Sequence, residues 1–308
     1  MKNRYIGSNI KTRSANPRRR TYHFYALAIL ICLIFAANVS AQNRQPTVSS
    51  KETAPLHLGL LPHLSSHLLI KKYQKLIIYL EKHLQRRIIV QTAPNFNIYT
   101  KRAIQGRYDL YLTAPHLAAF LESKYGHKRV VKFSNRLRGV IVVARDSAYQ
   151  RLSDLRGKVV AAPDELSVSA MLGEVTFLRN QINPQTDLIL KYTPSHNNAL
   201  HAVALGKADA AIAGLPAFKI TTAGSKLKRP LRILSKTHSI PQMMFMTPAR
   251  VSKSEREKFK QVLLNITNDA TGKAFVESVP FGHFSLITDR DMQELSDFVL
   301  ILEQRLKK

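Results

Sequence analysis

The stretch "KVVAAPDELSVSAMLGEVTFLRNQ", Lys158 to Gln181, decides the fold of this chain. Its first residues are typical of a buried strand, and the residues from Ser167 onward are typical of a helix. A short polar turn joins the two and carries Ser167 and Ser169. A strand that passes through a turn into a helix is the repeating unit of an α/β fold.

The two serines at the start of this helix have two interpretations. Ser167 fits the N-cap of a helix, where a serine hydroxyl accepts a backbone hydrogen bond. The other interpretation is an anion site, because the first N–H groups of a helix lack intrahelical partners and carry partial positive charge. Both interpretations stay open from these residues alone.

Strands and helices alternate on both sides of this stretch. Before it, residues 56–62, 86–93, 108–115 and 129–134 are typical of strands, and residues 65–84, 95–106 and 116–126 of helices. After it come strand-like residues 188–194, 208–214 and 231–237, a helix at 196–207, and helical segments at 252–275 and 290–306. Two extended segments, 139–147 and 241–248, join the blocks. The pattern predicts an α/β fold with mainly parallel sheets and two lobes.

The order of the blocks also predicts the domain boundaries. Residues 56–140 with 245–308 form the first lobe, and residues 141–244 form a second lobe inserted into it. In open α/β sheets, ligands bind beyond the carboxyl ends of strands. Five turns of this kind precede helices here: "LPHLSS", "TAPNFN", "TAPHLA", "APDELSVS" and "TPSHNN".

The N-terminus has the pattern of an exported protein. A basic region precedes an apolar core at about residues 24–37, and small residues end at Ala41. This pattern predicts a signal peptide at 1–41 and a flexible leader at 42–55. The alternative is a retained membrane anchor, because residues 21–42 carry no charge and could span a bilayer. The single cysteine, Cys32, lies in the apolar core, so no disulfide or thiol chemistry is expected after cleavage.

The chain is strongly basic, with 47 Lys and Arg against 20 Asp and Glu. Such a charge favours anionic small molecules, anionic membranes or nucleic acid, and export argues against nucleic acid. Enzymes are disfavoured too, because the sequence lacks G-x-S-x-G, H-E-x-x-H and phosphate-loop motifs. No catalytic residue, metal ligand or cofactor is predicted. Asp209 could bind a cationic group, although an aspartate in this position is more often structural.

Several segments together resemble a known family. "LHLGLLPHLSS", "YTKRAIQGRYDLYLTAPHLAAF", "LSDLRGKVVAAPDELSVSAMLG" and "SHNNALHAVALGKADAAIAG" occur in this order. The set resembles the periplasmic substrate-binding proteins of phosphonate, phosphite and phosphate ABC transporters. The resemblance implies a type II-like periplasmic binding protein whose two lobes close on a tetrahedral oxyanion.

The resemblance also implies where the ligand binds. The serine turn that holds phosphoryl oxygens in the family corresponds to Ser167 and Ser169, with Val168 where relatives often have a third hydroxyl. The family histidine corresponds to His196, beside Asn197. The family often has a tyrosine at two positions of the site where this chain has none. One of them holds Phe96 here, and the other falls near Thr113.

Chemistry at the turns completes the predicted site. Asn197 and Thr113 can donate hydrogen bonds to an oxyanion, as can His63 in "LPHLSS". Phe96 is expected to form a wall of the site. The predicted function is a monomeric periplasmic receptor that passes a small anion to an inner-membrane ABC permease. The alternative is a sensory or accessory binding protein on the same scaffold, which signals to a membrane-bound partner.

Overall fold

The computed structural model describes residues 54–64, 66–224 and 227–306 of the chain. The predicted signal peptide, the alternative anchor, Cys32 and most of the predicted leader lie outside these residues. Within the described ranges, no helix is both long enough and apolar enough to cross a membrane.

The first sheet has six strands in the order β11-β4-β10-β3-β1-β2. β1 pairs in parallel with β2 and β3, whereas β10 is antiparallel to both β3 and β4, and β11 is antiparallel to β4. The strands are β1 (Leu56–Leu60), β2 (Ile88–Gln91), β3 (Leu110–Thr113), β4 (Lys128–Phe133), β10 (Met244–Thr247) and β11 (Phe284–Ser285).

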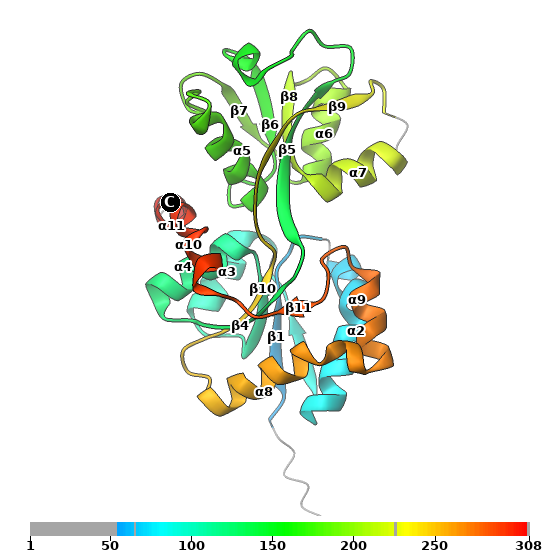
Figure 1. Ribbon diagram of the computed structural model, residues 1–308, viewed down its shortest axis with the longest axis vertical. Helices are drawn as coiled ribbons and strands as arrows, with labels where there is room; N and C mark the ends of the chain where they lie inside the picture. Colours follow the sequence, from blue (N-terminus) through cyan, green and yellow to red (C-terminus); the bar gives the residue numbers. More distant parts are fainter. Residues whose placement is uncertain (1–53, 65, 225–226, 307–308) are drawn as a thin grey trace, which may run out of the picture. The chain divides into compact units, whose positions relative to one another are not determined.

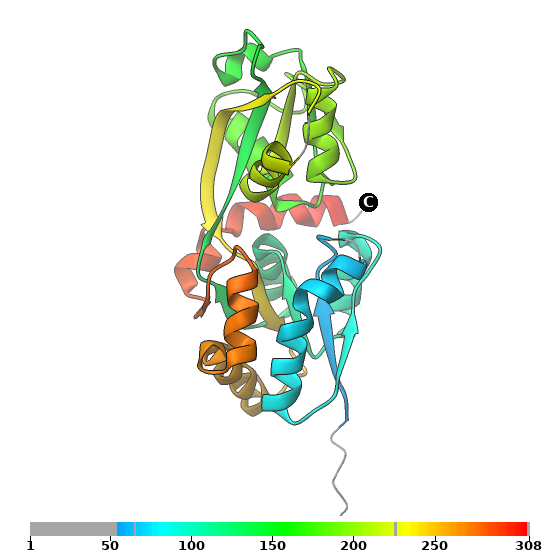
Figure 2. The same ribbon diagram turned by 90° about the vertical axis from the view of Figure 1, so that its right-hand side faces the viewer.

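Amphipathic helices cover this sheet. They are α2 (Ser66–Leu84), α3 (Phe96–Ile104), α4 (Pro115–Tyr125), α8 (Lys253–Leu264), α9 (Ala270–Ser278), α10 (Asp289–Gln293) and α11 (Ser296–Leu306), with a 3-10 turn, η2 (Ile266–Asn268). In α2, Leu69, Tyr73, Leu76 and Leu80 recur at helical spacing and are all buried. Figure 2 shows α9 lying beside α2, with which it shares many contacts.

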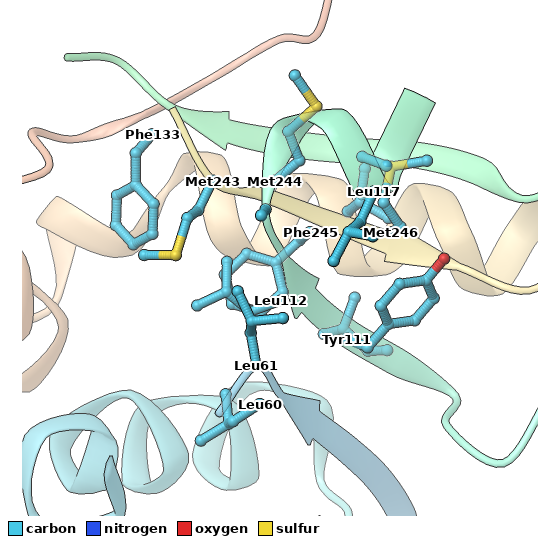
Figure 3. Close-up of a cluster of buried hydrophobic side chains, with 14 of the residues drawn as sticks. Leu60, Leu61, Tyr111, Leu112, Leu117, Phe133, Met243, Met244, Phe245 and Met246 are labelled. Atoms are coloured by element: carbon cyan, nitrogen blue, oxygen red, sulfur yellow. The ribbon is translucent and has the colours of Figure 1, made fainter. Parts of the chain in front are cut away.

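The core beside this sheet includes a run of sulfur-containing side chains. Met243 precedes β10, and Met244, Phe245 and Met246 belong to it. All four residues are almost fully buried. Figure 3 shows this run among Leu112, Leu117 and Phe133. Methionine fills irregular gaps well because its side chain is flexible and polarisable.

The second sheet has five strands in the order β7-β6-β8-β5-β9. β6 pairs in parallel with β7 and β8, and β5 is antiparallel to both β8 and β9. The strands are β5 (Arg136–Ala144), β6 (Val159–Ala162), β7 (Ile189–Tyr192), β8 (Ala210–Gly214) and β9 (Leu231–Pro241). The helices are η1 (Leu152–Leu155), α5 (Val168–Arg179), α6 (His196–Ala204) and α7 (Leu215–Gly224).

The α/β class and the two-lobed arrangement that the sequence predicts are confirmed, and the chain links its two sheets through β5 and the β9–β10 segment (Figure 1). The sheets are mixed rather than mainly parallel. In the first sheet β10 and β11 run antiparallel to their neighbours, and in the second β5 runs antiparallel to β8 and β9. The exact lobe boundaries stay a prediction.

Three features differ from the sequence expectations. Helix α7 and strand β11 are not among the elements that the sequence predicts. The predicted helix at 252–275 is interrupted by η2, after which Asp269 caps α9 by accepting from the N–H groups of Thr271 and Gly272. The predicted final helix divides into α10, whose start is fixed by a capping box of Thr288 and Asp291, and the separate helix α11.

Candidate functional site

The start of α5 offers backbone donors that no group in the described part of the chain uses. Ser167 occupies the N-cap position, but its side chain makes no capping hydrogen bond. The first helical bond runs from Met171 N to Ser167 O, 3.2 Å, so the N–H groups of residues 168–170 precede it and have no acceptor within the described residues. Ordinary capping by the Ser167 hydroxyl is therefore not what this turn does.

The turn before α5 is held by an aspartate. Asp164 accepts from Leu166 N through its carboxylate, 2.8 Å, and from Ser167 N through its carbonyl, 2.7 Å. The hydroxyls of Ser167 and Ser169 also have no hydrogen-bond partner among the described residues, and the two residues are only 6% and 4% exposed. Neither hydroxyl oxygen is a fully buried, unpartnered atom, so both remain accessible to a ligand or to water.

Other helices of the same type are capped in the usual way. Asn95 accepts from Ile98 N at the start of α3, and Ser195 accepts from Asn198 N at the start of α6. The starts of α4 and α5 lack a side-chain cap. The two uncapped starts lie next to each other, because the Nε2 of His116 in the first turn of α4 donates to Leu166 O, 2.9 Å.

His196 and Gly214 stand beside Ser169 in the second lobe. Gly214 ends β8 and donates its N–H to His196 Nδ1, 3.3 Å. A Cβ added to Gly214 would lie 3.4 Å from Ser169 Oγ and 3.9 Å from His196 Nε2. The hydroxyl and the imidazole therefore face a common point that a glycine leaves open.

The first lobe contributes polar groups at the ends of two neighbouring strands. Thr113 ends β3 and is fully buried, and its hydroxyl has no hydrogen-bond partner in the part of the chain that the structure describes. His63 follows β1, and Leu61 N donates to Leu112 O, 3.1 Å, which joins the two strand ends. The ring of His63 bonds through Nδ1 to Leu61 O, 3.0 Å.

The imidazoles at this site are neutral at pH 7. Burial, with a smaller contribution from His63, lowers the pKa of His196 to about 4. Burial likewise lowers the pKa of His63 to about 4, and only the carbonyl of Leu61 opposes this shift. His63 follows β1 of the first sheet, and His196 begins α6 beside the second sheet.

Two of the predicted site residues have other contacts. The side-chain oxygen of Asn197 accepts from Thr221 Oγ1, 2.8 Å. Phe96 begins α3 and is partly buried against the first core. Their predicted ligand roles stay predictions. Asp209 is structural, because its carboxylate accepts from Val159 N and from the Tyr149 hydroxyl, 2.9 and 2.7 Å.

Two further residues enter the site that the sequence reasoning did not assign. His116 binds the carbonyl just before Ser167, and Gly214 positions the His196 ring. His116 carried a weak signal, since it follows the strand-end proline of "TAPHLA". Gly214 carried none, because its role depends on contacts between β8 and α6.

A separate hollow of about 430 Å³ is lined by Lys101, Phe120, Tyr125 and their neighbours. Its wall includes the Lys124–Glu303 ion pair, 2.7 Å. It lies at the C-terminal end of α4, opposite the end that carries His116. It is therefore separate from the groups around Ser167.

The sequence matches the family described as the periplasmic substrate-binding protein of the phosphonate ABC transporter, over residues 58–292. The chain belongs to this family. Members serve transport by binding a solute, so the protein has a solute-binding role, and the family is not an enzyme class. Membership also implies a periplasmic location, a small phosphonate-type ligand and an ABC permease as partner.

Solved structures share the fold of this phosphonate-binding family member. PhnD1 from Prochlorococcus marinus, in complex with methylphosphonate, has a TM-score of 0.71 and 14% identity, with 80% of this chain and 98% of that chain covered. A binding component of an ABC phosphonate transporter from Pseudomonas aeruginosa has a TM-score of 0.69 and 15% identity, with 82% of this chain and 88% of that chain covered. A Xanthomonas citri protein bound to chloride has a TM-score of 0.69 and 22% identity, with 82% of this chain and 98% of that chain covered.

Proposed function

We propose that this binding protein captures a small tetrahedral oxyanion, of the phosphonate, phosphite or phosphate type, at the start of α5 and presents it to an ABC permease. The family and the fold support this proposal. The observation that carries it is the buried start of α5, where backbone N–H groups and the hydroxyls of Ser167 and Ser169 have no partner among the described residues.

These donors suit an oxyanion for a simple physical reason. The amides and hydroxyls are fixed by the helix and by the Asp164 turn, so they need little reorganisation when an anion arrives. The helix dipole adds partial positive charge at the same place. Each hydrogen bond to a charged oxygen contributes about 1.5–3 kcal/mol, more than one between neutral groups.

The remaining site residues complete the proposed anion site at the start of α5. His196 lies beside Ser169, and Thr113 and His63 offer groups from the first lobe. We place the free amide nitrogen of Asn197 and the ring of Phe96 at its margin. Because polar groups come from both lobes, ligand binding should favour a closed arrangement of the lobes.

A thermal-shift screen of the exported chain tests the proposal. Phosphate, phosphite, methylphosphonate, sulfate and carboxylates are compared with neutral and cationic solutes. We expect an oxyanion to raise the melting temperature. We expect Ser167→Ala with Ser169→Ala to weaken its binding by at least about 100-fold, as the loss of two charge-assisted bonds implies.

Ser153→Ala is the matched control, because Ser153 lies on the exposed turn η1 of the same lobe. It should leave anion binding unchanged. If only neutral or cationic solutes raise the melting temperature, or if the double variant binds oxyanions as well as the parent chain, the proposal is wrong.

The sensory or accessory role is the alternative that the same lobe closure serves. We propose the transport role because the family is one of ABC transporter components. We also propose a monomer, exported by a signal peptide at residues 1–41. Binding of the ligand-loaded protein to the permease, measured in vesicles, separates the transport role from the sensory one.

A further inference from the structure

The two histidines of the proposed site differ in which ring nitrogen carries the proton. A backbone carbonyl can only accept a hydrogen bond, and a backbone N–H can only donate one. Each ring nitrogen that contacts the backbone therefore reveals where the proton of the neutral imidazole lies.

In His63, Nε2 is the ring nitrogen without a proton. Its Nδ1 contacts the carbonyl of Leu61, 3.0 Å, so Nδ1 carries the proton. The ring also packs edge-on against Tyr73, with centroids 6.0 Å apart and planes at 88°, which fixes its orientation. Nε2 is therefore a hydrogen-bond acceptor, and it has no partner among the described residues.

His196 is the opposite tautomer, with its proton on Nε2. Its Nδ1 accepts the N–H of Gly214, 3.3 Å, so the proton lies on Nε2. That Nε2 lies on the same side as Ser169 Oγ, since both approach the point where a Gly214 Cβ would stand. His196 is therefore a donor, like the hydroxyls and amides at the start of α5.

A site with many donors and one fixed acceptor selects its ligand by protonation state. An oxyanion without a proton would place a negative oxygen against the lone pair of His63 Nε2, or leave that acceptor unpaired. An oxyanion that keeps one O–H satisfies the acceptor and offers its other oxygens to the donors. Sites that require one specific hydrogen bond reject ligands that cannot form it.

We propose that His63 is a specificity-determining residue, whose Nε2 accepts a hydrogen bond from the ligand and restricts the site to oxyanions that keep one proton. The class is the singly protonated phosphonates, phosphites and phosphates, and sulfonates and sulfate are excluded. This inference rests on the proposed function, because it requires that an oxyanion binds at the start of α5.

Methylphosphonate and methanesulfonate form a matched pair of probes. At a mildly acidic pH both are tetrahedral monoanions of similar size, and only methylphosphonate has an O–H. Titration calorimetry of the exported chain should show that methylphosphonate binds at least tenfold more tightly. Equal affinities would overturn the inference.

His63→Phe keeps a planar ring and removes the acceptor. We expect it to weaken methylphosphonate binding at least tenfold, to leave methanesulfonate binding the same or stronger, and so to abolish the preference. His67→Phe is the control, because His67 is exposed on the neighbouring first turn of α2. It should keep the preference of the parent chain.

The outcomes separate this inference from the proposed function. If the parent chain binds no oxyanion, the proposed function fails. If it binds both probes equally, or if folded His63→Phe keeps the preference for methylphosphonate, only the role of His63 fails. The comparison of the two probes on the parent chain needs no variant, so it decides the matter even if His63→Phe does not fold.

Discussion

At the residue scale, a missing side chain shapes the site as much as the polar groups do. Gly214 ends β8 where the Ser169 hydroxyl and the His196 ring converge. Its N–H orients the imidazole, and the absence of Cβ leaves space between the two side chains. A methyl group at this position would lie 3.4 Å or more from its neighbours, which is ordinary contact, so the fold itself does not require glycine here.

Gly214→Ala should therefore separate binding from stability. We expect the methyl group to occupy the space of the anion and to weaken binding by about tenfold or more, a loss of roughly 1.4 kcal/mol. The free energy of unfolding in urea should stay within about 0.5 kcal/mol of the parent chain. Calorimetry and urea melts check both. Unchanged affinity would place the ligand elsewhere.

His116 makes the stability of the protein depend on pH. Burial lowers its pKa from 6.5 to about 4, so as the pH falls the unfolded chain takes up a proton before the folded chain does. Stability should then fall between pH 6.5 and pH 4, at up to about 1.4 kcal/mol per pH unit for this group. His63, His127 and His196 act in the same direction.

Urea melts at several pH values measure this dependence. His116→Gln can still donate to Leu166 O but does not titrate, so its stability should fall less steeply over the same range. A parent chain equally stable at about pH 7 and about pH 4.5 would contradict the assignment of buried, neutral histidines.

At the element scale, α5 is held in place by close packing on β8. A Cβ on Gly173 would lie 2.6–2.7 Å from the side chain of Ile212, closer than carbon atoms approach. The helix also places Val168, Met171, Leu172 and Val175 in the larger core cluster. The start of α5 is thus fixed by its own packing, whether or not a ligand is present.

Gly173→Ala should destabilise the protein by about 1–3 kcal/mol, the usual cost of overpacking a core. The expected readout is a lower melting temperature, whereas Gly214→Ala serves as the glycine-to-alanine control that leaves it unchanged. A Gly173→Ala variant as stable as the parent chain would show that α5 can move away from β8.

The sequence predicted most elements because their patterns are local. The periodic apolar residues of α2 and the capped starts of α3 and α6 are visible along the chain. The break after Leu264 and the short strand β11 depend on tertiary contacts, and no local pattern marks them. In the site, Ser167, Ser169 and His196 follow from strand-end turns, whereas Gly214 and His116 act through neighbours distant in sequence.

At the scale of the whole molecule, the C-terminal helix joins the two lobes. α11 packs along α4, and its Arg305 donates to Glu174 of α5, 2.6 Å, and to the carbonyl of Glu165. Tyr192 of β7 donates to the same carboxylate, 3.1 Å, and its ring lies under the guanidinium. The Arg305 and Glu174 side chains are only 12% and 11% exposed.

Removal of the Arg305 charge should therefore cost stability. Arg305→Gln leaves the largely buried Glu174 carboxylate without its counterion, and we expect a loss of roughly 2–4 kcal/mol. Arg290→Gln is the control, because its ion pair with Glu294 is long, 3.7 Å, and its side chain is 89% exposed. It should cost less than about 0.5 kcal/mol. Equal effects of the two variants in thermal melts would contradict a structural role for the Arg305 link.

A crystal structure of the protein with methylphosphonate would locate the anion directly. We expect the phosphonate group at the start of α5, within hydrogen-bond distance of the hydroxyls of Ser167 and Ser169 and of at least one N–H from residues 168–170. A phosphonate bound elsewhere, with these donors still unoccupied, would contradict this expectation.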